Sequence, residues 1–457
     1  MRARDRLALL LGLLAASGAF AALLANGQPA ARAWTAAVAV VCACWWVFEP
    51  IPIPITSMLP LALLPLVGVL SPEQLGAAYG SPLILLLLGG FVLSKAMEHS
   101  GAHRRLALNM VRLFGGGDAR RLVLGFMAAA ALLSMWISNT ATTLMLLPVA
   151  LAVLGSGHAL LAPPLLLGIA YAASIGGIGT PIGTPPNLVF MQVYGDEFGT
   201  VPSFTQWMSW ALPLVLLFVP LAGLWLTRNL GGTPAPAVPE VGPWQPAERR
   251  TLIVFALTAL AWVTRREPFG GWSQWLNLPQ ANDASVALLA VVALFVIPDG
   301  RGGRLLSWQA AERIPWGVLI LFGGGIAIAK AFSVSGLSAL LGEALAGVGA
   351  WPLWLAVFTI ALSVTLLTEI TSNTAAAVLL MPILALAALA AGIDPRLLML
   401  PAAMSASCAF MLPVATAPNA IVYGSGVVSA ARMAREGLLL NLVGATCVTL
   451  VCLMVLG

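Results

Sequence analysis

The chain has 457 residues, of which 60% are hydrophobic and only 9% are charged, and its mean hydropathy is +0.96. A soluble domain carries about 25% charged residues, so this composition excludes a soluble protein. The net charge of +5 does not indicate a nucleic-acid partner, because the basic residues are spread over loops between apolar segments. The apolar runs lack the alternation of barrel strands, so we expect an all-α polytopic membrane protein.

The first half begins with Arg2, Arg4 and Arg6, followed by an apolar run over 7–24. A signal peptide is the alternative, but no clear cleavage site follows, so a first span with a cytoplasmic N-terminus is expected. The basic stretch 100–121 predicts an amphipathic helix on the cytoplasmic face. Further spans of the first half are expected near 33–48, 53–70, 80–95, 163–194 and 206–227.

A polar tripeptide interrupts apolar sequence twice, as Ser138-Asn139-Thr140 and as Ser372-Asn373-Thr374. A hydroxyl residue stands four positions before each serine, Ser134 in one copy and Thr368 in the other. The apolar arms around the first copy are too short for full spans, which favours a re-entrant hairpin. An isolated Ser or Thr in a membrane helix usually bonds to its own preceding turn, but the repetition argues for a functional site.

A glycine- and proline-rich stretch over 176–187 interrupts the apolar segment 163–194, and a shorter stretch at 413–419 with two prolines interrupts 397–425. Glycine and proline oppose a continuous helix, so an unwound loop is expected at membrane depth. Such backbone is tolerated only where it is buried in protein or lines a cavity. Each half is therefore expected to contain one broken helix.

The second half repeats these features in the same order and at an almost constant offset along the chain. The tripeptide at Ser138 recurs at Ser372, the motif at Thr184 recurs at Thr416, and Lys95 recurs as Lys330. Internal duplication follows. The predicted units are an N-terminal span over 1–32, a first repeat over 33–227, a cytoplasmic linker over 228–249 and a second repeat over 250–457. Spans of the second half are expected near 250–264, 285–298, 314–330, 397–425 and 437–456.

Eleven alternating spans with a cytoplasmic N-terminus place 17 of the 22 basic residues inside and 5 outside, as the positive-inside rule requires. The C-terminus then lies outside. Five spans per repeat is an odd number, so the two repeats have opposite orientation. Inverted repeats with broken helices are typical of secondary transporters.

The helix breaks predict an anion site with cation coupling. Helix N-termini attract anions, and neutral oxygens from Asn, Ser, Thr and backbone carbonyls suit Na⁺. Because the breaks contain no Arg or Lys, co-bound cations would offset the charge of a divalent anion. Glu369 is either a structural residue of the hairpin or a proton-coupling group. Lys95 and Lys330 are expected to be interface anchors.

Two functions of another kind are weighed against a transporter. An intramembrane serine hydrolase is disfavoured, because His99, His103 and His158 lie in or beside loops and no Gly-x-Ser-x-Gly motif occurs. A channel needs a continuous pore, whereas paired re-entrant sites with inverted symmetry indicate alternating access.

In its paired tripeptides, the loop 177–187 and the stretch 413–419, the sequence resembles the divalent anion/sodium symporter family. The resemblance implies homodimers of eleven-span protomers that work as elevators in the cell membrane. It implies substrate contacts at Asn139, Thr140, Asn373, Thr374, Thr416 and Ala417. It implies sodium ligands at Ser134, Ser138, Asn139, Gly179, Gly183, Thr184, Thr368, Ser372, Asn373 and Ala415.

The expected function is therefore Na⁺-coupled symport of di- or tricarboxylates such as succinate, malate or fumarate. The alternatives within transport are a sodium-independent carboxylate antiporter and a sulfate carrier. Ala417 departs from the family pattern, in which members that carry C4-dicarboxylates often have proline at this position of the second loop. Alanine removes a ring from the expected substrate wall.

Overall fold

The computed structural model describes residues 3–114, 117–155, 160–236, 242–267, 269–345 and 351–456. These residues form helices joined by short connections, with two isolated bridges and no strand among them. The all-α prediction is thereby confirmed. His158 and the centre of the predicted linker, residues 237–241, lie outside the described residues.

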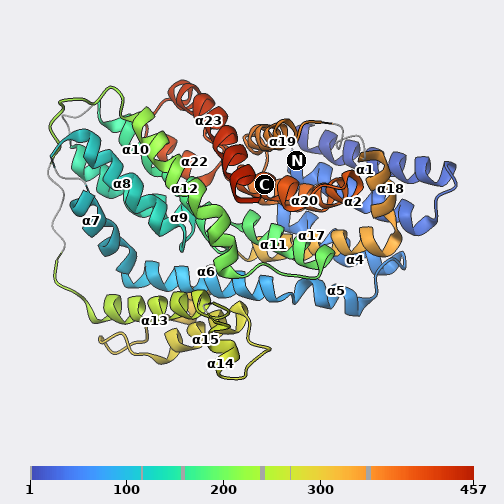
Figure 1. Cartoon of the computed structure of the whole chain (residues 1–457), viewed down its shortest axis with the longest axis horizontal. Coiled ribbons are helices and arrows are strands. Elements are labelled where there is room, and N and C mark those ends of the chain that lie inside the picture. Colours follow the sequence, from blue (N-terminus) through green and yellow to red (C-terminus); the bar gives the residue numbers. More distant parts are fainter. Residues whose placement is uncertain are drawn as a thin grey trace.

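The helices of the first half occupy most of the predicted spans (Figure 1). They are α1 (Ala3–Ala25), α2 (Ala30–Phe48), α3 (Ile53–Thr56), α4 (Leu59–Leu66), α5 (Pro72–Tyr79), α6 (Pro82–Ser100), α7 (Ala102–Phe114), α8 (Ala119–Ser134), α9 (Asn139–Leu154), α10 (Ala162–Gly176), the 3-10 turn η1 (Gly177–Gly179), α11 (Pro185–Phe198) and α12 (Phe204–Leu226).

The helices of the second half follow the same order. They are α13 (Pro246–Val263), α14 (Gly271–Trp275), α15 (Asp283–Val296), α16 (Trp308–Ala311), α17 (Trp316–Ser335), α18 (Leu337–Leu345), α19 (Leu353–Thr368), α20 (Asn373–Ala391), α21 (Arg396–Ser405), α22 (Ala417–Gly424) and α23 (Ala430–Leu456). The helix that starts at Asn139 has its counterpart starting at Asn373, and the one that starts at Pro185 has its counterpart starting at Ala417. Each tripeptide therefore stands at the start of a helix in the same place of each half.

Eight of the described helical segments are long and apolar enough to cross a membrane, including α1, α2, α12, α17 and α23. Four further apolar helical segments are shorter, among them α9 and α19, which flank the tripeptides. The chain is thus a multi-pass membrane protein.

Two predicted boundaries differ from the structure. The stretch 100–121 is not one helix, because α7 ends at Phe114 and Asp118 starts α8 by accepting a hydrogen bond from the Arg121 amide at 2.8 Å. The predicted linker 228–249 is shorter, because α13 begins at Pro246. The Glu248 carboxylate fixes that start by accepting a bond from the Gln245 amide at 2.8 Å.

Helix α10 lies at the centre of the packing, with all 15 of its residues buried. It packs against α8, α9, α12 and α22. The Tyr171 hydroxyl of α10 donates a hydrogen bond of 2.8 Å to the Phe410 carbonyl, which lies in the break between α21 and α22. The two breaks are therefore held in one core.

Candidate functional site

Each tripeptide begins a helix, and its serine is the N-cap. The Ser138 hydroxyl accepts a bond of 3.2 Å from the Ala141 amide at the start of α9, and the Ser372 hydroxyl accepts one of 3.5 Å from Ala375 at the start of α20. A serine N-cap satisfies one of the free amides of the first turn, so the sequence ends one helix and starts the next here. The asparagine that follows is the first residue of each helix.

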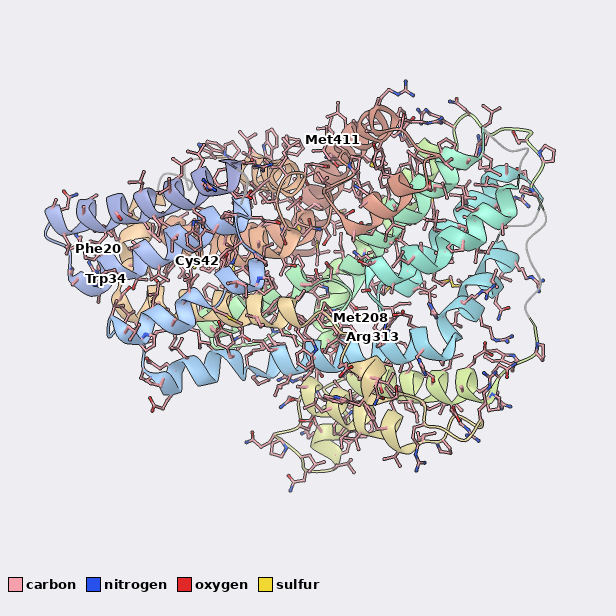
Figure 2. All side chains as sticks on the ribbon, turned by 180° about the vertical axis from the view of Figure 1, so that it is seen from behind. Phe20, Trp34, Cys42, Met208, Arg313 and Met411 are labelled. Atoms are coloured by element: carbon pink, nitrogen blue, oxygen red, sulfur yellow. The ribbon has the colours of Figure 1, made fainter. Side chains whose placement is uncertain are left out.

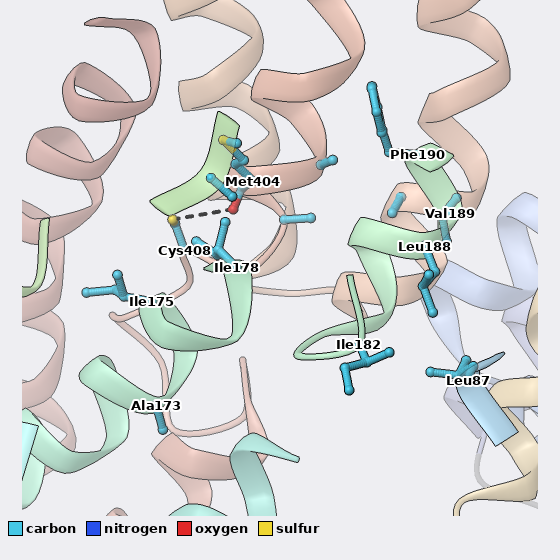
Figure 3. Packing of buried hydrophobic residues seen from close by; sticks show 14 of the residues in the cluster. Leu87, Ala173, Ile175, Ile178, Ile182, Leu188, Val189, Phe190, Met404 and Cys408 are labelled. Carbon is cyan, nitrogen blue, oxygen red and sulfur yellow. Dashed lines mark hydrogen bonds between the residues drawn. The ribbon is translucent and has the colours of Figure 1, made fainter. Parts of the chain in front are cut away.

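The two broken helices restart at threonines. Thr184 is the N-cap of α11, and Thr416 is the N-cap of α22, where its hydroxyl accepts a bond of 3.2 Å from the Asn419 amide. The two breaks also contact each other, since Ser407 and Thr184 place their hydroxyl oxygens 3.4 Å apart. Figure 3 shows Ile178 of the first break beside Met404 of α21. Four helix starts thus belong to one packed unit.

An asparagine three residues after each threonine holds the break in shape. The Asn187 side-chain amide donates to the carbonyls of Gly177, Ile178 and Thr180 at 3.0, 3.3 and 2.7 Å. The Asn419 amide donates to the carbonyls of Ala409 and Leu412 at 3.1 and 3.0 Å. Both asparagines stand in the motifs used for the family resemblance, but the sequence analysis assigned them no role. Buried unwound carbonyls need such donors.

All four helix starts open onto one cavity of about 960 Å³. Ser138, Thr184, Ser372 and Thr416, the four N-cap residues, line it. Each helix N-terminus carries free amides and a partial positive charge, so their convergence favours an anion. The cavity is lined by the six residues for which substrate contact was expected: Asn139, Thr140, Asn373, Thr374, Thr416 and Ala417.

The residues expected to bind sodium divide into two groups. Three of them are buried and do not line the cavity: Ser134, Gly179 and Thr368. The others line the cavity: Ser138, Asn139, Gly183, Thr184, Ser372, Asn373 and Ala415.

Neutral oxygens gather around Asn139 in the first half. The Ser134 hydroxyl lies 2.5 Å from Asn139 Oδ1. A Cβ on Gly177 would lie 2.6 Å from the same oxygen, and a Cβ on Gly183 would lie 2.4 Å from the Gly177 carbonyl oxygen. Gly177 therefore packs directly against the Asn139 side chain, and Gly183 packs against Gly177. Neutral hydroxyl and amide oxygens such as those of Ser134 and Asn139 can hold Na⁺.

The second half lacks the same hydroxyl contact. The Thr368 hydroxyl donates to the Thr365 carbonyl at 3.1 Å, which is a bond within its own helix. Asn373 Oδ1 is buried and has no hydrogen-bond partner among the described residues. An acceptor in this state is open to an incoming cation or donor.

The backbone of Gly177 lies so close to Gly183 that a side chain at position 183 has no room. We expect Gly183→Ala to lower transport about 100-fold, because the added methyl group must separate this loop from Gly177 and so move Asn139. Gly76→Ala is the matched control, since its methyl group would meet nothing within 4 Å. Initial uptake rates of the two purified variants make the comparison, and equal rates would contradict the close approach as a requirement.

Glu369 ties the second tripeptide to the second break. Its carboxylate accepts bonds from the amides of Phe410, Met411 and Leu412 at 2.7, 2.9 and 2.9 Å, and from the Asn441 side chain at 2.7 Å. Only 4% of the residue is exposed. This set of bonds favours the structural alternative over proton coupling. The first half uses its backbone instead, where the Thr180 hydroxyl donates to the Met135 carbonyl.

The cavity is also lined by three charged residues that no sequence motif indicates: Arg4, Glu49 and Arg313. Arg313 lies in the short segment between α16 and α17, where Figure 2 labels it. Its side chain is exposed. Arg313 is one of the 17 basic residues on the cytoplasmic side of the predicted topology, and neither a motif nor the repeat marks it as a site residue. At the offset that relates Lys330 to Lys95, the counterpart of Arg313 in the first half is Ala78.

A scan against family models matches residues 43–398 to CitMHS, the citrate transporter family. The chain belongs to this family. It is therefore a membrane transporter and not an enzyme.

The sodium-dependent dicarboxylate transporter SdcS of Staphylococcus aureus (strains bovine RF122 and USA300) is 39% identical over 441 residues. The match covers 91% of this chain and 84% of SdcS. Among solved structures, the fold is similar to the YdaH transporter of Alcanivorax borkumensis, with a TM-score of 0.58 and 18% identity. That similarity covers 85% of this chain and 88% of YdaH, and it concerns the fold alone.

Proposed function

We propose that this member of the citrate transporter family carries di- or tricarboxylates of the succinate, malate and fumarate class across the cell membrane, coupled to Na⁺. The observation that supports this proposal most directly is the cavity onto which four helix N-termini open. Glu49 is the only acidic residue among the described residues that line it. The SdcS relatives are named for sodium-dependent transport of dicarboxylates, which supports the same substrate class here.

In the proposed site, the carboxylates of the substrate meet the first turns of α9, α20 and α22. Asn139, Thr140, Asn373, Thr374 and Thr416 supply donors there, and Ala417 forms part of the wall. Na⁺ occupies the oxygens near Ser134, Ser138, Asn139, Gly179, Gly183 and Thr184 in the first half, and near Thr368, Ser372, Asn373 and Ala415 in the second. The bound cations offset the cost of holding a dianion away from water.

The proposed architecture is eleven spans in two inverted repeats, with the N-terminus in the cytoplasm and the C-terminus outside. The distribution of 17 and 5 basic residues supports this orientation. The nearly equal spacing of helix starts, 46 residues from α9 to α11 (185 − 139) and 44 from α20 to α22 (417 − 373), supports the repeat. An elevator motion of the tripeptide helices and the broken helices, in a homodimer, completes the proposal.

Uptake of radiolabelled succinate into proteoliposomes tests the proposed function. We expect uptake with an inward Na⁺ gradient and none when K⁺ replaces Na⁺. Uptake that needs no Na⁺ and requires carboxylate inside the vesicles would show that the protein is an exchanger and not a symporter. Transport of sulfate by a protein that transports neither succinate nor citrate would show that the substrate class is sulfate and not carboxylates.

Arg313 is expected to attract the anion to the cavity. We expect Arg313→Gln to raise the Kd for succinate roughly fivefold at low ionic strength, because it removes a positive charge from the cavity lining. The difference should shrink as choline chloride is added, since salt screens exposed charges. Arg249→Gln, an exposed arginine outside the cavity, is the control. An equal Kd for both variants would remove Arg313 from substrate recruitment.

A further inference from the structure

A second cavity, of about 620 Å³, borders the start of α9. Residues of α6, α7 and α9 line it, and it is not needed for the site proposed above. Ser138 and Thr140 line both this cavity and the larger one. The first turn of α9 thus separates two hollows, and an occupant of either one touches the tripeptide.

One wall of the second cavity is an apolar face of α9. It consists of residues three or four apart that share a helix face: Ala141, Leu144, Met145, Pro148 and Ala152. The face extends over roughly 16 Å at 1.5 Å per residue. Leu144 is 54% exposed although it points to this hollow. A water-soluble ion gains nothing from such a wall, whereas a hydrocarbon chain does.

The polar lining of the cavity holds two basic side chains, Lys95 and Arg104, and one acidic side chain, Glu98. Lys95 is paired with Glu98 at 2.9 Å, whereas Arg104 forms no ion pair with a described carboxylate. His103 is only 7% exposed, and its Nδ1 atom has no hydrogen-bond partner within the described ranges. Burial lowers the pKa of His103 below its usual range. A lowered pKa disfavours the charged imidazolium, so the positive charge open to an anionic headgroup comes from the unpaired Arg104 guanidinium, with Lys95 on the same cavity wall.

We propose that this cavity binds an anionic phospholipid, with the phosphate at Lys95 and Arg104 and one acyl chain on the apolar face of α9. Basic pockets between membrane helices recognise anionic headgroups in this way. The proposal depends on the membrane location of the chain and not on its coupling to sodium. Because Ser138 and Thr140 line both cavities, the lipid stabilises the first turn of α9 in its binding position and so raises transport.

Native mass spectrometry of the purified full chain with added phosphatidylglycerol tests the binding without any transport. We expect the wild type to retain one more lipid molecule than Arg104→Gln does. Arg112→Gln is the matched control, because Arg112 is an exposed arginine of the same helix that does not line the cavity. Ala152→Trp should also lose the lipid by filling the apolar end, whereas Leu151→Trp, which points elsewhere, should keep it.

Uptake in vesicles provides the second readout. Phosphatidylglycerol in phosphatidylcholine vesicles should raise the rate at least threefold for wild type and Arg112→Gln, and less for Arg104→Gln and Ala152→Trp. Equal lipid retention by Arg104→Gln and Arg112→Gln would overturn the proposal. So would stimulation by inorganic phosphate alone in phosphatidylcholine vesicles, since the occupant would then be a free anion. If no vesicle shows uptake, the proposed function fails while the lipid count still decides the binding.

Discussion

Asn139→Ala and Asn373→Ala are each expected to reduce succinate uptake by on the order of 100-fold while the protein still reaches the membrane. Asn139 Oδ1 lies 2.5 Å from the Ser134 hydroxyl and packs against Gly177. Asn373 Oδ1 is buried without a hydrogen-bond partner among the described residues. An incoming ion or substrate donor can therefore bind this oxygen without displacing a protein group. Each side chain lies at the first position of a helix whose start faces the cavity.

Initial rates per purified transporter in proteoliposomes measure this effect. Asn109→Ala removes an equivalent amide from an exposed position of α7 and should transport at the wild-type rate. Wild-type rates in both tripeptide variants would refute the proposed site. Loss in only one of them would restrict the site to one half of the chain.

The second large effect is expected on stability. Glu369→Ala removes the carboxylate acceptor of the Met411 and Leu412 amides and of the Asn441 side chain, and it leaves the Phe410 amide with only its 3.2 Å bond to Asn441 Oδ1. Each buried group left unsatisfied costs about 1–3 kcal/mol. We expect the break between α21 and α22 to loosen, and the apparent melting temperature in detergent to fall clearly. Glu369→Gln keeps one acceptor oxygen and should fall between the alanine variant and the wild type.

Glu312→Ala is the control for this effect, because Glu312 is an exposed carboxylate just before α17. Its melting temperature should match the wild type. Glu369→Gln with wild-type stability but a changed pH dependence of uptake would instead favour the proton-coupling alternative. That outcome would contradict the structural assignment.

The helix starts were predictable from the sequence because their determinants are local. Serine or threonine before a helix marks an N-cap, and proline marks a break, in the first half together with glycine, so Ser138, Ser372, Thr184 and Thr416 all stand out in the chain. Their recurrence at nearly the same offset in the two halves strengthened the signal. The start of α13 at Pro246 was missed because the charged residues before it resemble a linker.

Contacts between distant parts of the chain were not predictable in the same way. Glu369 reaches amides that follow α20 and α21 in the chain, and no local pattern reveals that its carboxylate closes the second break. Arg313 enters the cavity only because the segment before α17 packs beside it. The structure also distinguishes Ser134, which contacts Asn139, from Thr368, which bonds within its own helix. Equal places in a repeat therefore do not imply equal contacts.

The central claim is that anion and Na⁺ bind together where the four helix starts meet. Equilibrium binding of radiolabelled succinate to the purified protein in detergent tests it most directly, with Na⁺ varied against choline at constant ionic strength. We predict that the Kd for succinate falls roughly tenfold or more as Na⁺ rises, because coupled ligands strengthen each other reciprocally. K⁺ should leave the Kd unchanged. The same Kd for succinate with and without Na⁺ would contradict the account.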